Sequence, residues 1–103
     1  MIHVIATITL QPGVREPFLE VFRWLTPLVR AEDGCIEYQG TIDVPTTIAV
    51  QDGPRENVIT VVEKWESVEA LYAHSAAPHM TEYREQVKDF VTGVKLVVSE
   101  AAF

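Results

Sequence analysis

The chain has little cysteine and an excess of acidic over basic residues. Cys35 is the only cysteine among 103 residues, so no disulfide can form within the chain. A lone thiol is typical of a protein in the reducing cytoplasm, and its ordinary role is that of a small buried apolar residue. Eight Lys and Arg stand against fifteen Asp and Glu, a formal net charge of −7. Because an acidic surface repels phosphate backbones, we expect no nucleic-acid partner.

Long apolar runs and phosphate-binding loops are also missing. No segment approaches the roughly 20 apolar residues of a membrane span, and the first ten residues lack the basic start of a signal peptide. Neither a glycine-rich phosphate loop nor a nucleophile elbow occurs. Two of the three histidines, His74 and His79, lie five positions apart without an obvious third ligand, which is a poor zinc signal. We expect a cytoplasmic protein with no metal site and no membrane contact.

What the chain does contain is typical of one folded domain spanning residues 1–103. Hydrophobic residues make up 48% of the sequence and charged residues 22%, as in ordinary globular proteins. This length buries a sizeable core without disulfides or metals. No internal repeat, linker or low-complexity stretch divides it.

The first half of the sequence changes from a period of two to a period of three to four. Residues 2–10 alternate as a strand, with one wholly apolar face. From Val14 apolar residues recur at helical spacing, and Asp33-Gly34 ends this helix. Pro27 lacks the N–H for a bond to Arg23, so we expect a kink or a tightened last turn there. The apolar face of the strand comprises Ile2, Val4, Ala6, Ile8 and Leu10.

The middle of the chain predicts strands separated by a turn. Residues 35–43 form a second strand candidate, residues 46–50 a short third strand, and residues 51–57 (QDGPREN) a turn. Residues 58–65 (VITVVEKW) give the strongest strand signal in the chain. They are apolar on both faces, and such strands are covered on both sides.

The last third predicts two helices and a final strand. Ser67 caps a short helix that runs to about Ser75, and Pro78 sits in the first turn of another helix, which Gly93 ends. Residues 94–101 form the last strand. The order β-α-β-β-α-α-β is the α+β, ferredoxin-like split βαβ plan with an antiparallel sheet. Helices cover only one sheet face, so we expect a homodimer to cover the other.

Three segments carry a resemblance to a known family. DGCIEY, VVEKWESVEALYAH and APHM, in this order and spacing, resemble the antibiotic biosynthesis monooxygenase (ABM) family of dimeric α+β barrels over nearly the whole chain. The likeness is strongest to the small quinol monooxygenases. It implies an enzyme without metal, flavin or haem that oxidises a hydroquinone or polycyclic phenol with O2 in a pocket between sheet and helices. The positions that haem-degrading relatives need hold Thr7, His74 and Arg84, so haem chemistry is not expected.

Three residues are candidates for catalysis. Histidine has an unperturbed pKa of about 6.5 and suits a general base, and the resemblance places His74 on the pocket side of the second helix. Ala76-Ala77-Pro78 breaks the helix, so His74 and His79 can converge. Buried, hydrogen-bonded histidines, with His79 bracing the preceding turn, are the alternative. Glu63 shares a strand face with apolar residues, which raises the pKa of a carboxyl; it either serves the pocket or forms an ion pair at the dimer interface.

Candidate substrate-binding residues are mostly aromatic. Trp65 suits either a flat wall against an aromatic ring or core packing. The tyrosines can donate to a phenolate, or lie half-buried with the hydroxyl in water. Two other functions stay open: an isomerase or processing enzyme for a small hydroxycarbonyl signal, and a non-enzymatic module that binds an aromatic ligand. The candidates are Tyr38, Trp65, Met80, Tyr83 and Thr7.

Overall fold

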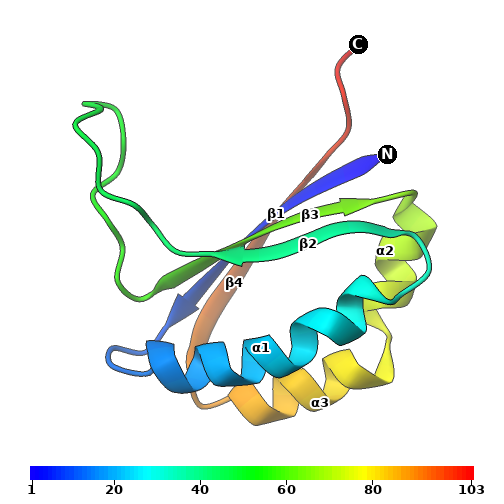
Figure 1. The fold of residues 1–103 in the computed structure, drawn as a ribbon, viewed down its shortest axis with the longest axis horizontal. Helices are drawn as coiled ribbons and strands as arrows, with labels where there is room; N and C mark the ends of the chain where they lie inside the picture. The colour runs from blue at the N-terminus through cyan, green and yellow to red at the C-terminus, as the bar shows by residue number, and fades with distance from the viewer.

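Four antiparallel strands form one sheet, and three helices lie on one side of it (Figure 1). The strand order in the sheet is β2-β3-β1-β4. The structure, a computed structural model, describes residues 1–103. It confirms the predicted α+β, ferredoxin-like fold. Along the chain the elements are β1 (Ile2–Leu10), α1 (Arg15–Arg30), β2 (Cys35–Thr41), β3 (Val58–Trp65), α2 (Val68–Ser75), α3 (Pro78–Val87) and β4 (Val91–Ser99).

The core lies between the helices and one face of the two central strands. Every second residue of β1 and β3 is buried there, and α1 lays its apolar stripe against them. Each large apolar side chain among them contributes roughly 1.5–3 kcal/mol by leaving water. At Gly40 a Cβ atom would lie 2.8 Å from Cε2 of Phe22, so this glycine lets α1 approach β2. The buried residues of α1 are Phe18, Phe22, Leu25 and Val29.

The end of α1 follows the prediction made from Pro27 and Gly34. The helix continues through Pro27 to Arg30, and the Glu32 N–H then donates to the Val29 carbonyl three residues back, at 3.0 Å. The last turn is therefore tightened. Gly34 has φ +83°, and a Cβ there would lie 2.6 Å from Cβ of Ala70, so the sharp turn into β2 needs glycine.

The two short helices begin as predicted, but the last strand begins earlier. Ser67 Oγ accepts from the Ala70 N–H at 3.1 Å, and Pro78 occupies the first turn of α3. The prediction that Gly93 ends α3 is wrong. The helix ends at Val87, and Gly93 lies inside β4, where it pairs with Thr9. Pairing with β1 decides the strand's start, and the sequence alone does not show this pairing.

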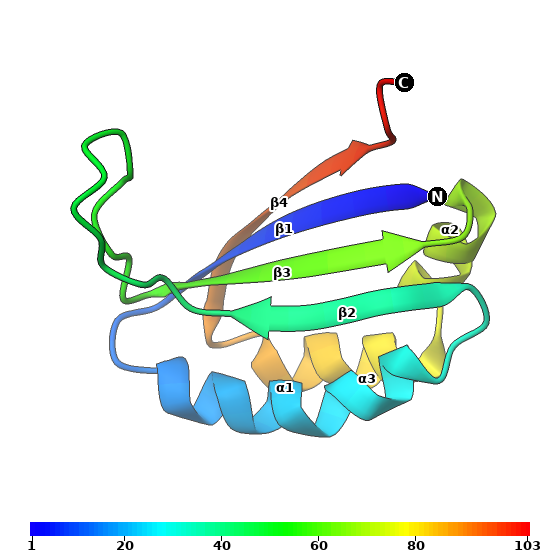
Figure 2. The same cartoon turned by 45° about the horizontal axis from the view of Figure 1, so that its top comes forward.

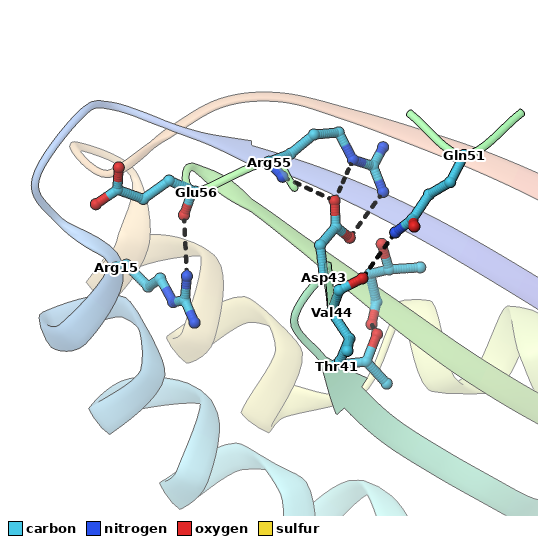
Figure 3. A network of polar contacts seen from close by, with 8 residues as sticks. Arg15, Thr41, Asp43, Val44, Gln51, Arg55 and Glu56 are labelled. Carbon is cyan, nitrogen blue, oxygen red and sulfur yellow. Dashed lines mark hydrogen bonds and ion pairs between the residues drawn. The ribbon is translucent and has the colours of Figure 1, made fainter. Parts of the chain in front are cut away.

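No strand forms at residues 46–50, so that prediction is wrong. Residues 42–57 form a long loop that projects beyond the end of the sheet (Figures 1 and 2). Its apolar residues have no partner strand, and Val50 is 92% exposed. Arg55 closes the loop by donating from Nε to Asp43 Oδ2 at 2.7 Å and from Nη2 to Oδ1 at 3.1 Å (Figure 3). These bonds lower the pKa of Asp43 to about 2.

The other face of the sheet carries no helix. In Figure 2, α1 and α3 lie below the sheet and no helix lies above it. We call this uncovered side the outer face. Ile5 pairs with both Val62 and Val97, so these three apolar side chains form one row across the outer face.

None of the three helices has the length and apolar composition that crossing a membrane requires.

Candidate active site between the sheet and the helices

An apolar cavity of about 690 Å³ lies between the sheet and the helices α2 and α3. Its volume is within the range of small-molecule sites. The floor is formed by β1 and β3, and one wall by the edge strand β4. Fourteen of its nineteen lining residues are hydrophobic. Among them are Val4, Ala6, Ile8 and Val61 from the floor, Val94, Leu96 and Val98 from β4, and Leu71, Met80 and Val87 from the helices.

Both candidate histidines bind one oxygen of a single carboxylate, which the sequence analysis did not identify. Glu32 Oε2 lies 2.9 Å from His74 Nδ1 and 2.7 Å from His79 Nε2. A carboxylate oxygen only accepts, so each of these ring nitrogens carries a proton. The Glu32 side chain is 13% exposed and that of His74 is 7% exposed. In neutral His74 the lone pair is therefore on Nε2, as in a histidine that acts as a base.

Two aromatic rings hold the His74 imidazole in place. The Trp65 ring centroid is 4.6 Å away at an interplanar angle of 34°, and that of Tyr38 is 5.6 Å away at 61°. The chain breaks at residues 76–77 between α2 and α3, and the new helix direction brings His79 to the Glu32 carboxylate. His74 is thus fixed by one hydrogen bond and two ring contacts, and it lines the cavity.

Glu63 lies on the cavity floor and not on the outer face. It is 5% exposed, and its Oε1 accepts from Trp65 Nε1 at 2.9 Å. Burial raises its pKa above the ordinary 4.5, while the bond from Trp65 and the charge of His74 oppose the rise. Glu63 is therefore a cavity carboxyl near His74, and its charge costs folding free energy.

Glu63→Gln is expected to stabilise the protein at neutral pH. Because the folded state holds this proton to a higher pH than the unfolded chain, wild-type stability falls as pH rises from about 4.5 through the folded pKa. The amide lacks this penalty and still accepts from Trp65. We expect a gain on the order of 1 kcal/mol at pH 7, the scale of a buried polar group's desolvation, which disappears below about pH 4.5. Urea unfolding at both pH values measures it, and an equal gain at both would contradict it.

Two tyrosines offer hydroxyl donors to the cavity. Tyr38 and Tyr83 are 4% and 8% exposed and both line the cavity. Burial raises the pKa of both phenols well above the usual range. They keep their protons at neutral pH, so they can donate to a phenolate or a quinone oxygen.

The structure brings together most, but not all, of the predicted site residues. His74, Glu63, Tyr38, Met80 and Tyr83 line the cavity. The other three predicted residues, Thr7, Trp65 and His79, do not line it. The prediction for Thr7 is corrected: it pairs with Thr60, and the alternation of β1 directs its side chain to the outer face. Trp65 is fully buried behind His74. His79 meets Glu32 outside the cavity lining.

Four polar residues of the site were not identified from the sequence: Glu32, which binds both histidines, and Ser75, Arg84 and Lys88, which line the cavity. Glu32 stands in an ordinary turn 42 residues before His74, and no spacing links the two. Arg84 lines the cavity from α3, and only its i+4 relation to Met80 signals this. No group of three or more His, Cys, Asp or Glu side chains is arranged to hold a metal ion.

This fold and this cavity define a ferredoxin-like α+β protein with a carboxylate-bound histidine at an apolar pocket. The sequence model of the antibiotic biosynthesis monooxygenase family matches residues 1–86. The chain belongs to this family, and it is an oxidoreductase of the monooxygenase class.

Individual relatives agree with this assignment. Over 90 residues, covering 85% of this chain and 86% of the relative, the sequence is 36% identical to the probable quinol monooxygenase YgiN of Escherichia coli strain K12. Among solved structures the chain is similar to PA3566 from Pseudomonas aeruginosa, with a TM-score of 0.81, 25% identity and coverage of 99% and 94% of the two chains. It is also similar to Rv0793 from Mycobacterium tuberculosis, with a TM-score of 0.80, 27% identity and coverage of 99% and 95%.

Proposed function

We propose that the chain oxidises a hydroquinone or polycyclic phenol with O2, without a cofactor, in the cavity between sheet and helices. The observation that carries this proposal is the Glu32–His74 hydrogen bond at the wall of an apolar cavity. A hydroquinone becomes a good electron donor to O2 once it is deprotonated, so the enzyme must supply a base and a donor for the phenolate. The similarity to a probable quinol monooxygenase supports the same substrate class.

The proposed step is proton transfer from a ring hydroxyl to His74 Nε2. Glu32 holds the opposite nitrogen, which keeps the lone pair on Nε2 and stabilises the imidazolium that forms. Tyr38 or Tyr83 donates to the developing phenolate. The floor of the cavity is apolar and buried, with Val4 and Val61 each 1% exposed, so these interactions act in a lower dielectric than that of bulk water. His79 shares the Glu32 oxygen and is proposed to brace it, and Glu63 to tune the charge beside His74.

The test is oxygen uptake by purified protein treated with a chelator, with freshly reduced menadiol as substrate. Uptake that saturates with menadiol and yields the quinone or a hydroxylated product supports the proposal. Isomerisation of a hydroxyketone without O2 would favour a signal-processing enzyme. A ligand-dependent rise in melting temperature with no turnover of any phenol would favour a binding module.

We also propose that two copies associate through the outer face. The row Val62, Ile5 and Val97 is apolar and no helix covers it, and a two-fold axis would bury it against itself. Ile5→Lys is expected to convert the dimer to a monomer, measured by sedimentation equilibrium. Leu28→Lys on α1 is the matched control, because both side chains are 40% exposed. A wild-type protein that sediments as a monomer at all concentrations would contradict the proposal.

A further inference from the structure

Two cations border a cavity whose lining is mostly apolar. Arg84 and Lys88 are among its lining residues. Met80, Arg84 and Lys88 follow one another at spacings of four, so the three side chains share one side of α3 and the residue after it. The chain carries a formal charge of −7 and only eight basic residues. Two of those eight line this cavity together with one acidic residue, Glu63, so basic groups outnumber acidic ones there, against the overall charge of the chain.

Arg84 has no carboxylate partner. Its Nη2 donates to the Ser75 carbonyl at 2.9 Å and to Ser75 Oγ at 3.3 Å, both neutral groups. None of the six ion pairs of the structure includes Arg84. Lys88 pairs with Glu85 at 2.7 Å, but both side chains are exposed, 60% and 72%. An exposed pair contributes little, so Lys88 can exchange its partner for a ligand.

The guanidinium is tied to the residue next to the proposed base. Ser75 follows His74 at the end of α2. Because Arg84 binds Ser75, its guanidinium lies at the part of the cavity lining that includes His74. Arg84 is an exposed residue at the rim of the cavity, and its charge opposes the rise in the pKa of the neighbouring Tyr83 that burial causes. A planar guanidinium with free N–H groups fits a carboxylate through two parallel hydrogen bonds.

Building on the proposed function, we propose that the natural substrate is an anionic aromatic alcohol. Its carboxylate or other acidic substituent ion-pairs with Arg84, aided by Lys88, while the hydroxylated ring lies at His74. The cavity has room for such a molecule: about 150 Å³ holds a single benzene ring, and this cavity has about 690 Å³. The anion would also fix which ring hydroxyl faces the base, so that Arg84 would determine substrate specificity.

Binding of a matched pair of ligands tests this without turnover. 6-Hydroxy-2-naphthoate and 2-naphthol differ only by a carboxylate, and isothermal titration at low salt gives both dissociation constants. We expect the carboxylate to bind about tenfold tighter or more, the scale of a hydrogen-bonded charge. The preference is expected to shrink as salt rises and to disappear in Arg84→Gln, while Arg84→Lys keeps part of it. Lys88→Gln is expected to reduce it.

The control is Lys95→Gln, which removes one positive charge from the opposite side of the sheet, where Lys95 pairs with Thr7. It is expected to leave the preference unchanged. Equal affinities for the two ligands, or a preference that survives in the Arg84→Gln, Lys88→Gln double variant, would overturn the inference. Oxygen uptake with 1,4-dihydroxynaphthalene and its 2-carboxylate separates the two proposals. If the protein prefers the carboxylate ligand in binding but consumes no oxygen with either substrate, the proposed function is wrong and the anion site stands. If it consumes oxygen with equal KM values for the two substrates, the anion site is wrong and the proposed function stands.

Discussion

His74→Gln is expected to lower kcat for hydroquinone oxidation about 10²- to 10⁴-fold, the usual contribution of a general base. Glutamine can still donate its amide to Glu32, so the turn keeps a hydrogen-bond partner, but it cannot take a proton from the substrate. KM is expected to change much less, because the apolar walls of the cavity that bind the ring are intact. Oxygen-electrode rates over a range of menadiol concentrations measure both constants.

The matched control for this variant is His3→Gln. His3 is paired with Lys64 and Ser99 on the outer face, so the same substitution there removes a histidine that is remote from the cavity. Its kcat is expected to equal that of the wild type. Melting curves of both variants separate lost chemistry from lost folding. A folded His74→Gln enzyme with wild-type kcat would exclude His74 as the base and direct attention to Glu63.

Glu32→Gln is expected to reduce kcat by about 10- to 10⁴-fold, between the effect of losing the partner of a metal-bound histidine and that of losing the carboxylate partner of a catalytic histidine. Glu32 does not touch the substrate in this scheme; it is a positioning residue. The amide oxygen can still accept from both imidazole N–H groups, as the single Glu32 oxygen does, but without its negative charge the side chain no longer stabilises a protonated His74. Steady-state kinetics should show the loss in kcat, with KM near the wild-type value.

Two further variants serve as comparisons for Glu32→Gln: Glu32→Asp is the conservative substitution, and Glu37→Gln is the matched control. The aspartate keeps the charge and should restore part of the rate, whereas a purely structural role would leave kcat unaffected in every folded variant. Glu37 pairs with Lys64 at 3.5 Å on the outer face, so its loss is expected to leave both constants unchanged. A Glu32→Gln enzyme that turns over normally would show that His74 needs no carboxylate partner.

The fold was predictable because local periodicity and sheet geometry agree over most of the chain. The alternation of β1 and the capped start at Ser67 translate directly into structure. The predictions failed where long-range pairing decides. Residues 46–50 (TTIAV) have strand composition but no neighbouring strand. Gly93 has the composition of a helix stop, although pairing with Thr9 includes it in β4.

The site was only partly predictable, for a different physical reason. His74 and Glu63 stand out in the sequence because their residue types are unusual in apolar surroundings. Glu32 does not, since an acidic residue in a turn is ordinary and its two histidine partners lie 42 and 47 positions away. Thr7 was predicted to bind substrate, whereas strand alternation places it with Thr60 on the opposite face.

The central strand β1 has a consequence for how this protein can evolve. Val4, Ala6 and Ile8 line the cavity while Ile5 lies in the row on the outer face. Substitutions can reshape either surface separately, but inserting or deleting one residue within β1 would exchange the two surfaces at once. Lineages that diversify this domain should therefore vary β1 in composition and never in length, and should confine length changes to segments such as residues 42–57.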